Sequence, residues 1–159
     1  AEIAGFMHDI GNVINRVDHA QSGAVMAFRL LDNLSMPAAE ICSIISAIGN
    51  HDESTAQPLN PISAALILAD KTDVRRSRVR NTDLITFDIH DRVNYAVESS
   101  NLSFNEDKTS LILNLKIDTS ISSVMEYFEI FMGRMLLCKK AALYLGIKFE
   151  LIINGTNIL

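Results

Sequence analysis

The sequence predicts a mostly α-helical protein that ends in a small α+β module. In the first half, apolar side chains recur at the three- and four-residue spacing of amphipathic helices. Over 92–118 the pattern changes to alternating and β-branched residues, which is typical of strands. Helical spacing returns over 120–145, and a short β-rich run, 148–153, follows it. We therefore predict a helical unit over 1–81 and a strand-strand-helix-strand module over 82–159.

Turn-forming and polar residues divide the first half into four predicted helices. Ser, Asn and Gly are common at helix ends, where the backbone leaves its helical conformation and unpaired polar groups need partners. The expected elements, in chain order, are a helix that Gly11 ends after about residue 10, a loop over 12–18, a helix over about 19–33, a third helix that Ser35 caps, a polar loop over 52–60, and a fourth helix from Pro61 to about Arg80.

The second half predicts a β-hairpin, a long helix and a last strand. Residues 92–105 and 109–118 flank a turn-like stretch, which favours a hairpin. Gly146 ends the long helix, and the final strand would join the hairpin as a parallel or edge strand. The helix would cover one face of this sheet of about three strands. Because the other face and the edges stay open, we expect the module to pack on the helical unit or to form a homodimer.

Composition narrows the class of protein. The net charge of -5 at pH 7 disfavours a general nucleic-acid or anionic-membrane surface. No apolar run is long enough to span a bilayer and no signal peptide is recognisable, so we expect a cytoplasmic protein. Cys42 and Cys138 are expected to be reduced thiols. The chain opens inside an apolar helical stretch without a capping residue, so we expect it to be part of a longer protein.

Several ionisable side chains fall where the helical spacing predicts buried positions. His8 and Asp9 end the first apolar stripe, and His19 begins the second. His51 continues the stripe of the third helix, and Asp70 lies on that of the fourth. A buried carboxylate is costly unless it is paired or bound to a metal. Imidazole and carboxylate ligands together suit Mn, Fe, Co, Ni or Zn better than Mg or Ca.

The segments that hold these residues are FMHDIGN, HAQSGA, GNHDE and LILADKTD. Their order resembles the successive motifs of the HD superfamily of metal-dependent phosphohydrolases, and their spacing is also similar to the HD domain of bacterial endoribonuclease Y. The resemblance covers roughly residues 1–80. It implies an HD-type helical domain with one or two divalent transition metal ions, Mn, Fe, Ni, Co or Zn.

The resemblance also implies a role for each residue. His8, Asp9 and Asp70 would hold one metal ion, together with a His from a helix upstream of Ala1. Asp9, a catalytic residue in this scheme, would bridge to a second ion held by His19 and His51. Two ions about 3.5–4 Å apart can activate water and stabilise both oxygens of an in-line displacement at phosphorus.

Two residues are predicted to contact substrate close to these motifs. Asn12 follows the first motif at a position where relatives often carry a Lys that contacts phosphate. Lys71, next to Asp70, could supply that positive charge, in catalysis as well as in substrate binding.

The residues after Asp70 allow two interpretations each. Arg75 is predicted to contact phosphate, as part of a basic clamp, or else to lie on a solvated helix face. Asp73 could orient a metal ligand or be an ordinary surface acid. Arg76, Arg78 and Arg80, like Arg75, could belong to the phosphate clamp or lie on the solvated helix face. A second His-Asp pair, His90-Asp91, lies outside the helical stripes and is expected to have only a structural role in a turn or strand.

These observations favour a hydrolase that cleaves a phosphate ester or anhydride, of a nucleotide or another small phosphorylated substrate, with metal-activated water. The alternative is a degenerate HD module that binds a nucleotide or partner without catalysis. A ribonuclease would follow only from the similarity to endoribonuclease Y, and the acidic charge argues against it.

Overall fold

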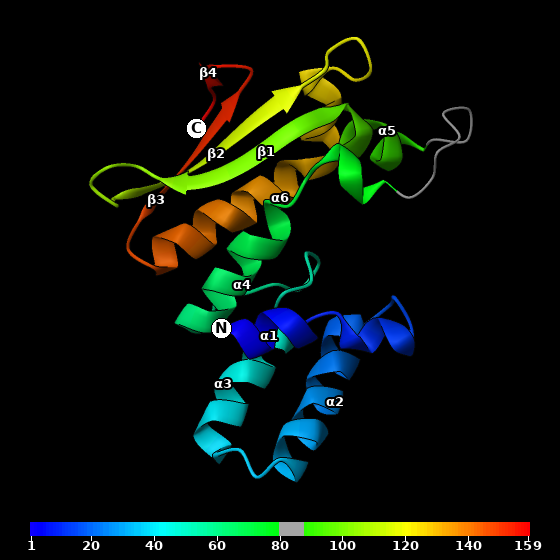
Figure 1. Ribbon diagram of the computed structural model, residues 1–159, viewed down its shortest axis with the longest axis vertical. Helices are drawn as coiled ribbons and strands as arrows, with labels where there is room; N and C mark the ends of the chain where they lie inside the picture. Colours follow the sequence, from blue (N-terminus) through cyan, green and yellow to red (C-terminus); the bar gives the residue numbers. More distant parts are fainter. Residues whose placement is uncertain (80–87) are drawn as a thin grey trace. The chain divides into compact units, whose positions relative to one another are not determined.

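A computed structural model of the protein describes residues 1–79 and 88–159 (Figure 1). These residues form two compact units, 1–70 and 71–159. The first is helical and the second combines helices with one sheet, so the predicted class, mostly α with a C-terminal α+β module, is confirmed. The boundary predicted after Asn81 lies outside the described residues.

The first unit consists of short helices joined by tight connections. In chain order the elements are α1 (Glu2–Met7), the 3-10 helix η1 (Ile10–Val13), α2 (His19–Asn33), α3 (Ala38–Gly49) and α4 (Pro61–Lys71). Lys71, the last residue of α4, belongs to the second unit. The predicted bounds of α2 are confirmed, and α1 and α3 lie where helices were expected.

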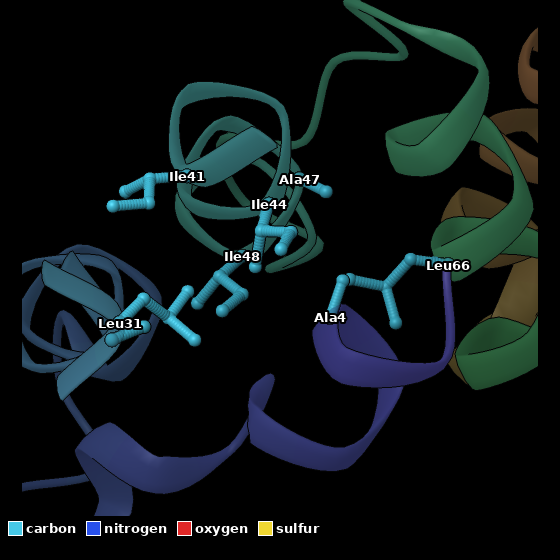
Figure 2. Close-up of a cluster of buried hydrophobic side chains, with 8 residues drawn as sticks. Ala4, Leu31, Ile41, Ile44, Ala47, Ile48 and Leu66 are labelled. Carbon is cyan, nitrogen blue, oxygen red and sulfur yellow. The ribbon is translucent and has the colours of Figure 1, made fainter. Parts of the chain in front are cut away.

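The core of this unit is small and aliphatic (Figure 2). Leu31 from α2 packs with Ile41, Ile44 and Ile48 from α3, and Ala4 brings α1 against the same cluster. The three Ile side chains recur at three- and four-residue steps, which places them on one face of α3. Full burial of each such side chain contributes about 1.5–3 kcal/mol. This cluster holds the ends of the helices in place around the polar residues described below.

Two turn residues of the first unit behave differently from the prediction. Ser35 does not cap α3, whose N-cap residue is Pro37, without a side-chain cap. Ser35 has a φ of 58°, and the Met36 N–H beyond it bonds back to the Leu31 carbonyl. The left-handed turn therefore ends α2. Gly11 does not stop α1, which ends earlier, but lies buried inside η1.

The fourth helix begins as predicted and ends early. Asn60 and Ser63 exchange hydrogen bonds at its start, where the Asn60 side chain accepts from the Ser63 N–H at 2.8 Å. The prediction extended this helix to about Arg80, which is outside the described residues, but α4 ends at Lys71. Contacts within the second unit hold the chain in another conformation beyond it, because the Thr72 carbonyl accepts from the Ser100 hydroxyl and Val74 is fully buried.

The second unit is built on one sheet with the strand order β1-β2-β3-β4 (Figure 1). Its elements in chain order are η2 (Arg76–Arg78), α5 (Ile89–Ala96), β1 (Val97–Phe104), β2 (Ser110–Ile117), α6 (Val124–Tyr144), β3 (Lys148–Ile153) and β4 (Thr156–Asn157). β1 and β2 form the predicted hairpin, and β3 joins β2 in parallel, one of the two predicted arrangements. The two-residue β4 adds a fourth strand where about three were expected.

The start of this unit corrects a predicted strand. The residues before Val97 form α5, and its N-cap Asp88 accepts a hydrogen bond from the Asp91 N–H at 2.8 Å. Val93 and Ala96 are three residues apart, so they lie on one side of α5, and both are buried. The helix also contacts α6. Helical burial therefore outweighs the β-branched composition that suggested a strand.

The long helix α6 lies along one face of the sheet. Ser123 and Glu126 form a capping box at its start, with the Ser123 hydroxyl accepting from the Glu126 N–H. Phe131, Met135 and Cys138 are fully buried on the side that faces the sheet. Alternate strand residues complete this core, namely Leu111, Leu113, Leu115, Ile117, Phe149, Leu151 and Ile153. Within 1–79 and 88–159, none of the helices has both the length and the apolar character needed to cross a bilayer.

Candidate metal centre

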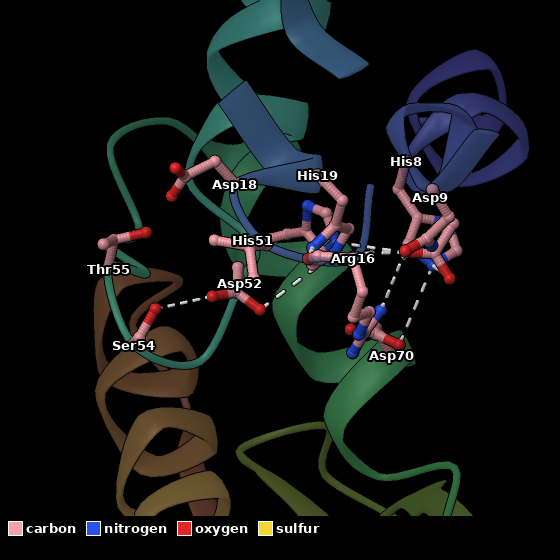
Figure 3. Close-up of polar contacts among 12 residues, drawn as sticks. His8, Asp9, Arg16, Asp18, His19, His51, Asp52, Ser54, Thr55 and Asp70 are labelled. Atoms are coloured by element: carbon pink, nitrogen blue, oxygen red, sulfur yellow. Dashed lines mark hydrogen bonds and ion pairs between the residues drawn. The ribbon is translucent and has the colours of Figure 1, made fainter. Parts of the chain in front are cut away.

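The predicted ligands come together in the first unit at the ends of its helices (Figure 3). His8 is the residue after α1, and Asp9 is the N-cap of η1. His19 begins α2, and Asp70 lies in the last turn of α4. His51 lies two residues beyond α3, not within it as the helical spacing suggested.

Each of the three imidazoles is oriented by the same local contact. The Nδ1 atom of His8 lies 2.7 Å from the Gly5 carbonyl oxygen, three residues before it. The equivalent contacts are 3.0 Å from His19 to the Arg16 carbonyl and 2.6 Å from His51 to the Ile48 carbonyl. A carbonyl only accepts, so each Nδ1 must carry a proton, and in a neutral ring each Nε2 then presents a lone pair. This is the arrangement in which a metal-binding His is held by its second nitrogen.

The first ligand group is Asp9, His19 and His51. The two Nε2 atoms are 3.2 Å apart, and Asp9 Oδ1 lies 3.3 Å from that of His19 and 3.7 Å from that of His51. Two ligands about 2.1 Å from one ion and about 90–110° apart are separated by about 3.0–3.4 Å. The donor atoms therefore have nearly the spacing that a single transition metal ion requires.

The second group is His8, His51 and Asp70, whose ligand atoms lie within 4.8 Å of one another. His8 Nε2 is 3.8 Å from Asp70 Oδ1 and 3.5 Å from Asp9 Oδ2. Asp9 therefore directs Oδ1 to the first group and Oδ2 to His8 of the second. A carboxylate with its two oxygens divided in this way has the form of a bridging ligand.

Burial gives the centre a closed and an open side. The side chains of His51 and His19 are 1% and 3% exposed, whereas that of Asp9 is 47% exposed. The imidazoles form the floor of the site, and a ligand from solution would reach it beside Asp9.

A close backbone contact sets the position of η1 relative to α2. A Cβ atom added to Gly11 would lie 2.0 Å from the His19 carbonyl oxygen and 2.7 Å from the Gly23 nitrogen. Only a residue without a side chain fits here. The Gly11 that follows His8-Asp9 therefore brings Asp9 close to the first turn of α2, where His19 lies.

Two residues at the centre were missed by the sequence analysis. Asp52 Oδ1 is 4.0 Å from His19 Nε2, and the Ser54 hydroxyl donates to its other oxygen at 2.6 Å. The His51-Asp52 dipeptide itself was the available signal. Arg16 places Nη1 3.8 Å from Asp9 Oδ1 and is 71% exposed. It lies in a loop between motifs, and no spacing rule marks it.

The predicted substrate-binding residues fall into both units. Asn12 lies in η1, exposed, and its side-chain oxygen accepts from Arg16 Nη1 at 3.4 Å. Lys71, the last residue of α4, is buried. Its predicted roles in catalysis and substrate binding stay predictions.

Arg75 and Asp73 contact each other within the second unit. Arg75 does not continue the helix of Asp70, because α4 has ended and the residue is extended, with a φ of -163°. Its Nε is 2.8 Å from Asp73 Oδ1, and Arg78 lies 3.4 Å from the other oxygen. The predicted phosphate contact and ligand-orienting role stay predictions.

Arg76 has a structural position in the same segment. Its Nε donates to the Tyr95 carbonyl at 2.7 Å, and its guanidinium lies over the Tyr95 ring. The second His-Asp pair, His90-Asp91, occupies the first turn of α5, not the turn or strand expected. The His90 carbonyl accepts from the Asn94 side chain, and the imidazole is exposed.

The described residues therefore include two groups of His and Asp side chains that could hold a metal ion. Comparisons with known proteins add nothing to this assignment: no family model, no curated protein and no solved structure matches the chain significantly.

Proposed function

We propose that the first unit binds one or two divalent transition metal ions and hydrolyses a phosphate ester or anhydride of a nucleotide or another small phosphorylated substrate. The observation that carries the proposal is the position of Asp9, whose two carboxylate oxygens point to two different groups of ligand atoms. The resemblance of this chain's His and Asp segments to the motifs of HD phosphohydrolases supports the same proposal.

The chemistry of the donor set fits such ions. Three imidazole nitrogens, which are borderline ligands, combine here with two carboxylates, which are hard ligands. This mixed set suits Mn, Fe, Co, Ni or Zn. The backbone carbonyls that hold each Nδ1 fix the orientation of the rings before any ion arrives. When bound, a metal ion of this kind supplies a nucleophile from water at neutral pH and neutralises charge on the phosphate.

The protein's own groups would then divide the remaining work. His19 and His51 form the buried floor and keep bulk water away from one side of the site. Asp9 and Asp70 supply the negative charge that balances bound cations, and Asp9 lies at the open side. The exposed Arg16 has its Nη1 atom 3.8 Å from Asp9 Oδ1, and its guanidinium could bind a phosphate oxygen.

The test is a hydrolysis assay on the full chain with a panel of substrates. Cyclic nucleotides, mononucleotides, dinucleotides and a generic phosphodiester would each be assayed with added Mn, Fe or Ni. We expect turnover of at least one substrate, and we expect Asp9→Ala and His8→Ala to abolish it. His90→Ala is the matched control, because it removes an exposed His of the second His-Asp pair and should leave turnover unchanged.

The same experiment separates the proposal from its alternative. Full metal occupancy without turnover of any substrate would favour a module that binds a nucleotide or a partner without catalysis. Turnover that survives Asp9→Ala would contradict the assignment of the site itself.

A further inference from the structure

The outward side of α6 carries an apolar stripe that the described residues of its own unit leave exposed. Met125, Met132, Leu136 and Leu143 follow one another at intervals of seven, four and seven residues, which places them on one face of the helix. Their exposed fractions are 67%, 45%, 55% and 74%. Other residues of the same helix, Phe131, Met135 and Cys138 among them, are buried. The helix itself lies along the sheet (Figure 1).

Two charged residues complete this stripe. Glu129 and Lys139 are exposed and fall between the apolar residues, so that the six positions advance by four, three, four, three and four residues. This alternation is the spacing of the positions that face a partner helix in a coiled coil. Neither charge has an ion-pair partner within the portion of the chain that the structure describes.

The stripe is symmetric about Arg134. Met125 and Leu143 lie nine residues on either side of it, Glu129 and Lys139 five, and Met132 and Leu136 two. In an antiparallel pair of identical helices centred at this residue, each position meets its counterpart. Met125 would face Leu143 of the other copy, and Met132 would face Leu136.

The charges obey the same symmetry. Glu129 would face Lys139 of the other copy, and the two-fold axis would produce this pair twice. In a parallel pair, Glu129 would instead face Glu129 and Lys139 would face Lys139. The order of charges therefore favours the antiparallel arrangement and opposes the parallel one.

We propose that α6 is a homodimer interface, in which the Met125–Leu143 stripe packs antiparallel against the same stripe of a second copy. Each α6 would then be covered on one side by its own sheet and on the other by its partner. A polar pair within an apolar seam fixes register, so the two Glu129–Lys139 pairs would align the helices and the four apolar residues would supply the contact area.

The test is the dimer dissociation constant of the full chain, measured by analytical ultracentrifugation. We expect a dimer for the unaltered protein. Glu129→Lys and Lys139→Glu should each weaken it at least about tenfold, because each change breaks both symmetric pairs. The double variant Glu129→Lys/Lys139→Glu should restore it.

An equimolar mixture of the two single variants is the sharpest arm of this test. Each Lys at position 129 would then meet a Glu at position 139 of the other chain, and each Lys at position 139 a Glu at 129. We expect the mixture to form a heterodimer that neither variant forms with itself. Leu136→Glu should abolish dimers, and Phe104→Glu, an equally exposed apolar residue on β1, should not.

Several outcomes would overturn the proposal. One is an unaltered chain that stays monomeric at every concentration, and another is a dimer that is indifferent to Leu136→Glu and to both charge reversals. Failure of the mixture to pair would show that the stripe meets another surface, such as the first unit of the same chain. A dimer that Phe104→Glu dissociates, and that the α6 variants leave intact, would place the interface at the edge strand β1. Circular dichroism of each variant confirms that its fold is intact.

Discussion

The Nε2 atoms of His19 and His51 face each other at 3.2 Å in the interior of the first unit. Each ring has its Nδ1 hydrogen bonded to a backbone carbonyl, so in neutral rings both facing nitrogens carry lone pairs. Two such lone pairs repel unless a cation lies between them. Asp9 Oδ1, 3.3 Å from His19 Nε2, completes an arrangement that suits a metal ion.

Metal binding should stabilise the protein through Asp9 and not through the second His-Asp pair. An ion that binds only the folded state, and that is present at a concentration about 100 times its dissociation constant, adds about 2.7 kcal/mol to the free energy of unfolding. We expect Mn²⁺ to raise the melting temperature of the unaltered chain and of His90→Ala, and not that of Asp9→Ala. Equal shifts in all three, measured by differential scanning calorimetry, would refute this ligand assignment.

Gly11 should not tolerate a side chain. Because an added Cβ would lie 2.0 Å from the His19 carbonyl oxygen, Gly11→Ala must displace η1 from α2. Overpacking of this kind costs about 1–3 kcal/mol, and Asp9 would move with η1, which should weaken metal binding. Gly5→Ala is the control: nothing lies within 4 Å of the added atom, so helix propensity alone should stabilise α1 by up to about 1 kcal/mol. Similar denaturation midpoints in urea for the two variants would show that the close contact is unimportant.

Arg16 should affect substrate and not metal. It lies 3.8 Å from Asp9 Oδ1 but carries no ligand atom for a cation. Loss of a charge-assisted hydrogen bond to phosphate costs about 1.5–3 kcal/mol, so Arg16→Ala should lower kcat/KM by about 10–100-fold. The kcat/KM of Arg16→Lys should lie between those of Arg16→Ala and the unaltered chain. The Mn²⁺-dependent rise in melting temperature should persist. An unchanged kcat/KM would mean that Arg16 does not contact substrate.

The capping box of α6 should make stability depend on pH in the acid range. Hydrogen bonds from the Ser123 N–H and the Ser122 hydroxyl, with the nearby Arg92 guanidinium, hold the pKa of Glu126 below its usual value. A lowered folded-state pKa means that the carboxylate stabilises the fold above about pH 4.3, the unfolded value, and that this stabilisation is lost as the pH falls through the folded value. The difference in unfolding free energy between the unaltered chain and Glu126→Gln should therefore shrink in acid. A difference that is constant from neutral to strongly acidic pH would show that the Glu126 carboxylate does not stabilise the fold through the capping box.

The sequence predicts most of the fold where local signals and tertiary packing agree. The bounds of α2 follow from its apolar spacing, and Asn60 marks the start of α4 through a side-chain cap. Packing decides where the prediction fails. α4 stops at Lys71 although no Gly or Pro follows it directly, because burial of Val74 and the bond from Ser100 to Thr72 hold the chain away from the helix.

The candidate site shows the same division. Its His and Asp ligands could be found from sequence because each interrupts an apolar stripe, where an unpartnered polar group would be costly. Arg16 could not be found in this way, since an exposed Arg in a loop is ordinary on any surface. Asp52 lies in a polar stretch, and its one signal was the His51-Asp52 dipeptide. The orientation of the rings also required the structure, because it depends on backbone carbonyls that carry no sequence signal.

The most direct test of the metal centre is anomalous X-ray scattering from crystals of the chain grown with Mn²⁺. We predict an anomalous peak within bonding distance, about 2.0–2.3 Å, of Asp9 Oδ1, His19 Nε2 and His51 Nε2. A second peak beside His8, Asp70 and Asp9 Oδ2 would show that the site holds two ions, with Asp9 bridging them. A well-ordered site with no anomalous density among these side chains, at Mn²⁺ concentrations that saturate binding in solution, would contradict the account.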